Sequence, residues 1–348
     1  MNKKKEWGIV MSVLAGHKDE GLNVRLISIL LLALALLVSC ARRETKGAES
    51  AAEPGTGNVT QKTFASPAAA GAALFEAAKN GDQKALMAIF GPEGKDVLFS
   101  GDAVKDKNNA ERFVSAYSRM NRWSKNQSGE EILYIGAENF PFPIPLDQNS
   151  SGQWSFNTAA GKDEVLARRI GDGELTAIGV LTEIANAQQE FFSRNHQFAE
   201  KFVSDEGQQN GLYWPVAEGQ PPSPLGPLAE FAKALGYSHT DKPQPFNGYF
   251  YKMLTQQGAT AKGGPRNYVT DGKLTGGFAV VAWPARYRDS GIMTFIVGKD
   301  GVIYEKDLGE GTAQAAPTLA AYNPGEGWSV VLAPESPGVR AGTRNAKK

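Results

Sequence analysis

Hydrophobic positions divide this chain of 348 residues into one long apolar run, a polar stretch and two regions with regular periods. Residues 26–38 contain only Leu, Ile, Ala and Val apart from Ser28. Residues 41–62 are rich in Ala, Gly, Glu, Lys and Thr and hold a single branched aliphatic residue, Val59. Because such a composition cannot bury a core, residues 40–62 are predicted to form a flexible tether.

The first periodic region shows helical spacing with clear start and stop signals. Ser66 followed by Pro67 is typical of a helix start, and Gly81 is typical of a helix end. Asp82 can then cap a second helix. Aromatic residues at i, i+4 spacing predict a third helix over residues 109–123.

The period then changes to two, which predicts short strands over residues 132–137, 140–146 and 154–156. Prolines alternate with apolar residues in the second of these, so it is expected at a sheet edge. Helices followed by an antiparallel sheet predict an N-terminal α+β unit over residues 63–160. In element order this unit resembles the nuclear-transport-factor-like cone fold of exported lipoproteins.

A second unit is expected over residues 161–310, beginning with a long helical pattern over residues 162–194. Gly171 and Gly173 are expected to break this pattern, leaving a main helix from Glu174.

The second unit then carries a series of strands that are each bounded by Gly, Pro or Asp. The predicted strands cover residues 248–254, 277–283, 292–297 and 302–307. Asp300 and Gly301 lie between the last two, which is a strong hairpin signal. We therefore expect a four-stranded antiparallel meander packed on the long helix, followed by a C-terminal extension over residues 311–348 with a disordered end. The fold class is α+β.

The apolar run ends on a lone cysteine, Cys40, with small or aliphatic residues before it. This is the pattern of a secretory leader with its cleavage site, and residues 37–40 resemble a bacterial lipobox. Residues 1–39 are thus predicted to be a lipoprotein signal peptide, with a lipid on the Cys40 sulfur. By resemblance to lipoproteins of diderm bacteria, Ala41 after the cysteine implies the periplasmic side of the outer membrane.

Two alternatives to the leader fit the sequence less well. A transmembrane anchor would need about 30 Å of apolar helix, whereas thirteen residues span about 20 Å. A buried helix with an incidental thiol is disfavoured because the residues after Cys40 are abruptly polar.

Composition and charge indicate a globular protein and disfavour a nucleic-acid-binding function. Lys plus Arg and Asp plus Glu both number 37, so the formal net charge is zero. Nucleic-acid binding requires a basic face, so we expect no nucleic-acid partner. A hydrophobic content of 41% with 17 Phe is a globular composition.

Several glycine and aromatic motifs resemble one family. They are Gly211-Leu212-Tyr213-Trp214-Pro215, Pro222-Ser223-Pro224-Leu225-Gly226-Pro227-Leu228, Gly248-Tyr249-Phe250, Gly276-Gly277-Phe278, Ala282-Trp283-Pro284, Gly291, Thr294-Phe295 and Asp300-Gly301-Val302-Ile303-Tyr304. From about Phe64 to about Asn323 the chain resembles the domain of unknown function 2950 family of bacterial envelope proteins. This resemblance implies an exported protein and no established activity.

The second unit also resembles the head of type II/IV pilins and pseudopilins, because a long helix precedes an antiparallel sheet. A filament-forming pilin carries an apolar N-terminal half-helix of about 20 residues. Here residues 163–173 are rich in charge instead. We therefore expect a pilin-like head that does not polymerise as a pilin.

Signatures of catalysis and metal binding are scarce. His17 falls within the predicted leader, and the other two histidines, His196 and His239, lie far apart with no cysteine or paired acid beside them. No nucleophile elbow, phosphate-binding loop or dinucleotide fingerprint occurs in the sequence. No catalytic residue, metal or cofactor is therefore predicted.

Paired carboxylates are the one feature that favours an enzyme, since glycosidases use two acids. Asp300, Glu305 and Asp307 cluster late in the predicted sheet, and Glu130-Glu131 opens a strand. A hairpin turn accounts fully for Asp300, and Glu305 and Asp307 share the expected solvent face of an edge strand, so a catalytic role is disfavoured.

Loops rich in aromatic residues and proline are the better candidate for a ligand or partner surface. Tyr213 and Trp214 precede a proline-rich stretch, and Trp283, Arg286 and Tyr287 are expected in a loop after a strand. Such loops offer stacking faces to sugars or a groove to a peptide, although they also simply cover a sheet.

The leading hypothesis is a lipid-anchored envelope protein that acts as a non-enzymatic binding or scaffolding module. Its partners would be the membrane, through the lipid on Cys40, and an envelope protein or a polysaccharide. The alternatives are a hydrolase that acts on envelope carbohydrate and an accessory protein of a secretion or pilus machine.

Replacing Cys40 by Ser is expected to move the protein from the membrane fraction to the soluble fraction, because the only lipid acceptor is removed. The measurement is cell fractionation together with mass spectrometry of the mature N-terminus. A wild-type N-terminus without an acyl chain would contradict the assignment.

Overall fold

A computed structural model describes residues 60–238 and 243–331. The chain from Val59 onward forms one compact unit. The predicted leader over residues 1–39, Cys40, Ala41 and the tether up to residue 59 lie outside the described residues. Within the described ranges no helix is both long and apolar enough to cross a membrane.

Four helices open the described chain: α3 (Pro67–Lys79), α4 (Gln83–Phe90), α5 (Gly94–Leu98) and α6 (Ala103–Arg119). The Ser66 hydroxyl caps α3 and the Asp82 carboxylate caps α4, as the sequence predicted. The third predicted helix, over residues 109–123, is wrong at both ends. It begins earlier because Asp102 caps it, and it stops before Trp123, which lies in strand β1.

The N-terminal sheet is antiparallel and contains β1 (Asn121–Lys125), β2 (Glu131–Ile135), β3 (Phe140–Pro141), β4 (Leu146–Gln148) and β5 (Trp154–Phe156). The strand order is β1-β2-β4-β5, with β3 paired to β2. The single strand predicted over residues 140–146 is divided into β3 and β4, because its prolines cannot donate ladder hydrogen bonds. Leu146 and Phe156 of this sheet pack with Leu74 and Phe90 in one buried cluster.

Helix α7 (Thr158–Asn195) runs without interruption for 38 residues, about 57 Å at 1.5 Å per residue. The break predicted at Gly171 and Gly173 is therefore wrong. Gly173 is needed for close approach, since a methyl group there would overlap the carbonyl oxygen of Ser290. The boundary predicted between residues 160 and 161 falls inside this helix.

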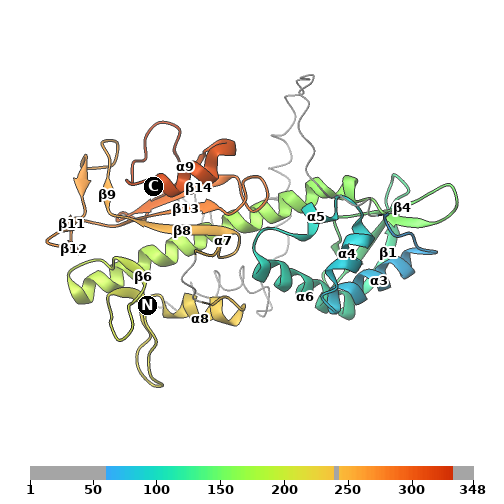
Figure 1. The fold of residues 1–348 in the computed structure, drawn as a ribbon, viewed down its shortest axis with the longest axis horizontal. Coiled ribbons are helices and arrows are strands. Elements are labelled where there is room, and N and C mark those ends of the chain that lie inside the picture. Colours follow the sequence, from blue (N-terminus) through green and yellow to red (C-terminus); the bar gives the residue numbers. More distant parts are fainter. Residues whose placement is uncertain (1–59, 239–242, 332–348) are drawn as a thin grey trace, which may run out of the picture. The chain divides into compact units, whose positions relative to one another are not determined.

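The C-terminal sheet contains β8 (Tyr249–Leu254), β13 (Ala279–Pro284), β14 (Met293–Gly298), β15 (Ile303–Asp307) and β16 (Ser329–Val330). The order is β16-β15-β14-β13-β8 and every pair is antiparallel, so the predicted four-stranded meander is confirmed and gains one short edge strand. Helix α7 packs on this sheet, and α9 (Thr312–Thr318) packs on β13 (Figure 1). The mixed α+β class is confirmed.

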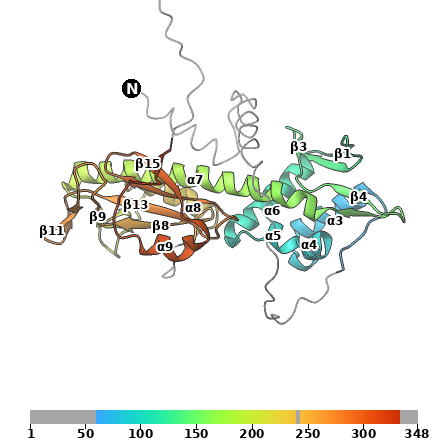
Figure 2. The same cartoon turned by 90° about the horizontal axis from the view of Figure 1, so that it is seen from above.

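Short elements complete the C-terminal part. They are β6 (Lys201–Val203), β7 (Gly211–Tyr213), α8 (Gly226–Ala234), β9 (Gln256–Gln257), β10 (Arg266–Asn267), β11 (Val269–Thr270), β12 (Lys273–Leu274) and the 3-10 turn η1 (Gly309–Gly311). Figure 2 shows α7 running along the sheet toward the N-terminal helices. The predicted C-terminal extension contributes α9 and β16, and residues 332–348 lie outside the described part.

Two glycines in α7 provide a matched test of its packing. Gly173→Ala is expected to destabilise the fold by about 2 kcal/mol, because the added methyl overlaps backbone. Gly171 has open space around it, so Gly171→Ala is expected to stabilise the helix by up to about 1 kcal/mol. Urea unfolding measures both, and equal effects of the two changes would contradict this packing.

Candidate functional site

The aromatic residues predicted as a ligand surface lie in different environments. Trp283 is within β13 and not in a loop; it is 9% exposed and its ring packs 5.7 Å from that of Phe250. The loop that follows β13 carries Arg286, which is exposed, and Tyr287, which is half-buried. Trp283 therefore lies in the strand predicted over residues 277–283, and the loop expected to include it begins only after Pro284, because the apolar ring of Trp283 completes the core.

Tyr213 ends β7 and Trp214 follows it; both are half-buried against the C-terminal core. The prolines at 221 and 222 in the next loop are exposed. Across the described residues, no hydrogen bond or ring contact joins Tyr213 or Trp214 to Arg286 or Tyr287. The predicted surface thus consists of two separate groups.

A buried polar cluster, which the sequence reasoning missed, joins the N-terminal helices to the C-terminal sheet. We call it the clamp; it consists of Asp102, Lys105, Arg169, Tyr237 and Asp289. All but Tyr237 are less than 10% exposed. Burying charge is costly unless every charge is paired and hydrogen-bonded, so the partners of these groups decide what the clamp can do.

Asp102 links the cap of α6 to the hairpin turn before β8. One carboxylate oxygen accepts the N–H of Lys105 at 3.0 Å and so caps the helix. The other accepts the Tyr237 hydroxyl at 2.7 Å and the N–H of Gly248 at 3.1 Å. Asn247 and Gly248 both have positive φ, +51° and +85°, as a two-residue type I′ hairpin turn requires.

Lys105 also binds this turn, through the carbonyl oxygen of Asn247. Its ammonium group lies 2.8 Å from a carboxylate oxygen of Asp172 on α7 and 3.3 Å from the carbonyl oxygen of Asn247. The Asn247 N–H in turn donates to the Tyr237 hydroxyl oxygen at 3.1 Å. Burial and the hydrogen bond to Asp102 raise the pKa of Tyr237 well above its usual range, so its hydroxyl stays a donor.

Arg169 of α7 binds both parts of the chain at once. Its guanidinium donates to the carbonyl oxygens of Asp96 at 3.0 Å and Val97 at 2.7 Å, and it pairs with Asp289 in the loop after β13. The other oxygen of Asp289 pairs with Arg286 at 2.8 Å. Every charge in the clamp therefore has a protein partner, and its chemistry is that of a structural joint.

Carboxylates in the neighbourhood are similarly engaged. Burial raises the pKa of Asp106, whose carboxylate accepts both the N–H and the hydroxyl of Ser100. One oxygen of Glu174 accepts the N–H groups of Ile292 at 2.9 Å and Met293 at 3.0 Å. Burial and the nearby Glu174 raise the pKa of Glu305.

The other carboxylates that the sequence put forward serve local structure. Asp300 accepts the Val302 N–H at 3.2 Å within its turn, and Asp307 accepts the N–H of Gly309 and the hydroxyl of Tyr287. Glu130 accepts from the Asn126 side chain, and Glu131 lies in β2. Searching the described ranges finds no group of three residues able to hold a metal ion.

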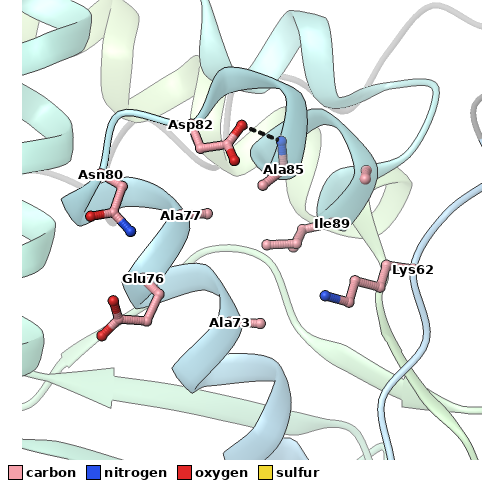
Figure 3. A pocket seen from close by; sticks show the side chains of 9 residues that line it. Lys62, Ala73, Glu76, Ala77, Asn80, Asp82, Ala85 and Ile89 are labelled. Atoms are coloured by element: carbon pink, nitrogen blue, oxygen red, sulfur yellow. Dashed lines mark hydrogen bonds between the residues drawn. The ribbon is translucent and has the colours of Figure 1, made fainter.

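A shallow hollow of about 300 Å³ lies between α3 and α4 (Figure 3). Its wall is apolar and includes Ala73, Ala77 and Ile89, whereas Lys62 and Glu76 are exposed at its edge. The one hydrogen bond drawn among its lining residues caps α4, from the Ala85 N–H to the Asp82 carboxylate, so the hollow is a surface depression between two helices.

One signal in the sequence points to part of the clamp. Asp102 stands directly before the first turn of α6, where a helix cap is expected. Arg169 had no comparable signal, because its partners are backbone carbonyls about 72 residues away and an aspartate 120 residues away.

Removing the charge of Asp289 tests the clamp. Asp289→Asn is expected to cost about 3 kcal/mol in free energy of unfolding, because it leaves the buried Arg169 charge uncompensated. Glu164→Gln removes a partner of Arg168 that is 53% exposed and should cost less than about 1 kcal/mol. Similar losses for the two variants in urea would exclude the assigned role.

Comparison with known families gives one match. The family model described as protein of unknown function (DUF2950) matches residues 61–331, which covers the described part of the chain almost completely. Searches of curated proteins and of solved structures gave no match. The match includes the turn at Gly248 that Asp102 holds and the loop that carries Asp289. The chain therefore belongs to the DUF2950 family, as its glycine and aromatic motifs predicted.

Proposed function

We propose that this protein is exported, lipid-anchored through Cys40 on the periplasmic side of the outer membrane, and acts as a non-enzymatic binding or scaffolding module. The apolar run before Cys40 supports export and lipid anchoring. The clamp is the single observation that carries the scaffolding role. Its charged groups all bind one another or the backbone. They therefore hold the fold rigid, and they are not free to act on a substrate.

A rigid body suits a protein that presents surfaces to envelope partners. Helix α7 supplies much of the C-terminal core, and its Val165 packs against the N-terminal cluster that contains Leu74 and Phe90. The clamp fixes the loop after β13 against α5 and α7. Preorganised surfaces lose less conformational entropy on binding. The groups that would meet an envelope protein or a polysaccharide are Tyr213 with Trp214, and Arg286 with Tyr287.

A second candidate function is carbohydrate hydrolysis. Glu174 and Glu305 lie close enough for one to raise the pKa of the other, a property that general acids use. Against this role, one oxygen of Glu174 already binds two backbone N–H groups. A third candidate is an accessory protein of a secretion or pilus machine. Its only support is that a long helix packed on a meander sheet resembles the architecture of a pilin head.

Recovery of partners from the protein's own envelope tests the proposal. The acylated wild-type protein is expected to retain an envelope component that Trp214→Ala or Tyr287→Ala reduces, while Val216→Ala, a change at a neighbouring exposed residue, leaves recovery intact. If the wild-type protein releases sugar from purified envelope and Glu305→Gln abolishes this release, the hydrolase is favoured. Recovery of secretion or pilus components would favour the accessory role.

A further inference from the structure

Arg288 is unusual among the residues with left-handed backbone. The described non-glycine residues with positive φ are Asn139, His196, Asn247, Asp271 and Arg288. Asn, Asp and His are enriched in this region, whereas a long side chain is not. A left-handed conformation costs a residue of this kind roughly 1 kcal/mol, and it persists only where the surroundings impose it.

The surroundings that impose it are hydrogen bonds within the loop and the burial of the clamp residue Asp289. The Arg288 N–H donates to the carbonyl oxygen of Gly291 at 2.8 Å, and the Ser290 N–H donates to the carbonyl oxygen of Arg286 at 2.9 Å. Asp289, between them in sequence, is buried against Arg169. The loop is therefore held tightly on its inner side while Arg288 faces solvent.

The Arg288 side chain has no structural task that would explain the strain. It is exposed, and its guanidinium carbon lies 5.5 Å from the centre of the Tyr287 ring. Among the described residues it makes no ion pair, and its one polar side-chain neighbour is the Tyr287 hydroxyl, which leaves most of its five N–H donors unused. The Tyr287 hydroxyl is anchored to Asp307 at 3.1 Å, and that carboxylate also accepts the Gly309 N–H. A guanidinium with free donors is thus presented beside a fixed aromatic ring.

We infer that Arg288, with Tyr287, binds a carboxylate group of an acidic envelope polysaccharide. The planar guanidinium matches a carboxylate with two parallel hydrogen bonds, and an adjacent aromatic ring can pack on a sugar. The neighbouring Asp307 repels such a ligand less than a free carboxylate would, because two donors already engage it. This inference rests on the binding role proposed above and names its ligand class.

The experiment measures binding of oligogalacturonate, a carboxylated probe, to the soluble Cys40→Ser protein. Arg288→Gly is expected to weaken binding about tenfold, the effect of one lost charge-assisted pair, while its urea midpoint stays equal or rises because glycine relieves the strain. Arg122→Ala is the matched control, since Arg122 is also exposed and lies over a half-buried tyrosine, Tyr134, at 4.5 Å, with ordinary backbone. It should bind as the wild type does.

Each other outcome overturns the inference. These are unchanged binding by Arg288→Gly, an equal loss in Arg122→Ala, equal binding of neutral dextran, or a lowered urea midpoint in Arg288→Gly. Binding to phosphatidylglycerol vesicles with the same dependence on Arg288 would assign the group to phosphate instead. If Arg288→Gly still recovers the wild-type partners from the envelope, only this inference fails and the binding role stands.

Discussion

The ion pair between Arg169 and Asp289 is the contact on which the remaining structure depends. Arg169 projects from the continuous helix α7, and its guanidinium also holds two carbonyl oxygens at the end of α5. One side chain therefore joins the N-terminal helices, the central helix and the loop after β13. Because a buried charge without its partner is costly, the three segments are held in place together.

Nearby contacts act in the same direction. Gly173, one turn further along α7, lets the helix approach the carbonyl of Ser290 in the same loop. Asp102 and Lys105 hold the hairpin turn before β8 through backbone groups. Asp102 and Lys105 bind backbone groups of this turn and not its side chains. These contacts can therefore form only when the turn itself has formed. The chemistry left for function therefore lies on the outer surface, where Trp214, Tyr287 and Arg288 are accessible in part.

Local signals explain which elements could be predicted. The caps at Ser66 and Asp82, the turn at Gly301 and the four strands of the meander follow from rules that act over a few residues. Errors arose where distant contacts override a local rule. Gly171 and Gly173 do not end α7, because packing on the sheet outweighs their low helix propensity. Trp283 does not form part of a loop, since the core needed its ring.

The amino-acid pattern was enough to predict the α+β class, the family and the strands of the C-terminal meander, and to raise the expectation of a lipid on Cys40, because each rests on local pattern or on motif. The pairing of Asp102 with Tyr237 and of Arg169 with Asp289 came from folding alone, since the partners are 135 and 120 positions apart and also bind backbone groups. Backbone hydrogen-bonding groups are the same at every residue, so no sequence pattern marks them as partners. For that reason the clamp, and the strained Arg288 that it holds, became visible only in the folded chain.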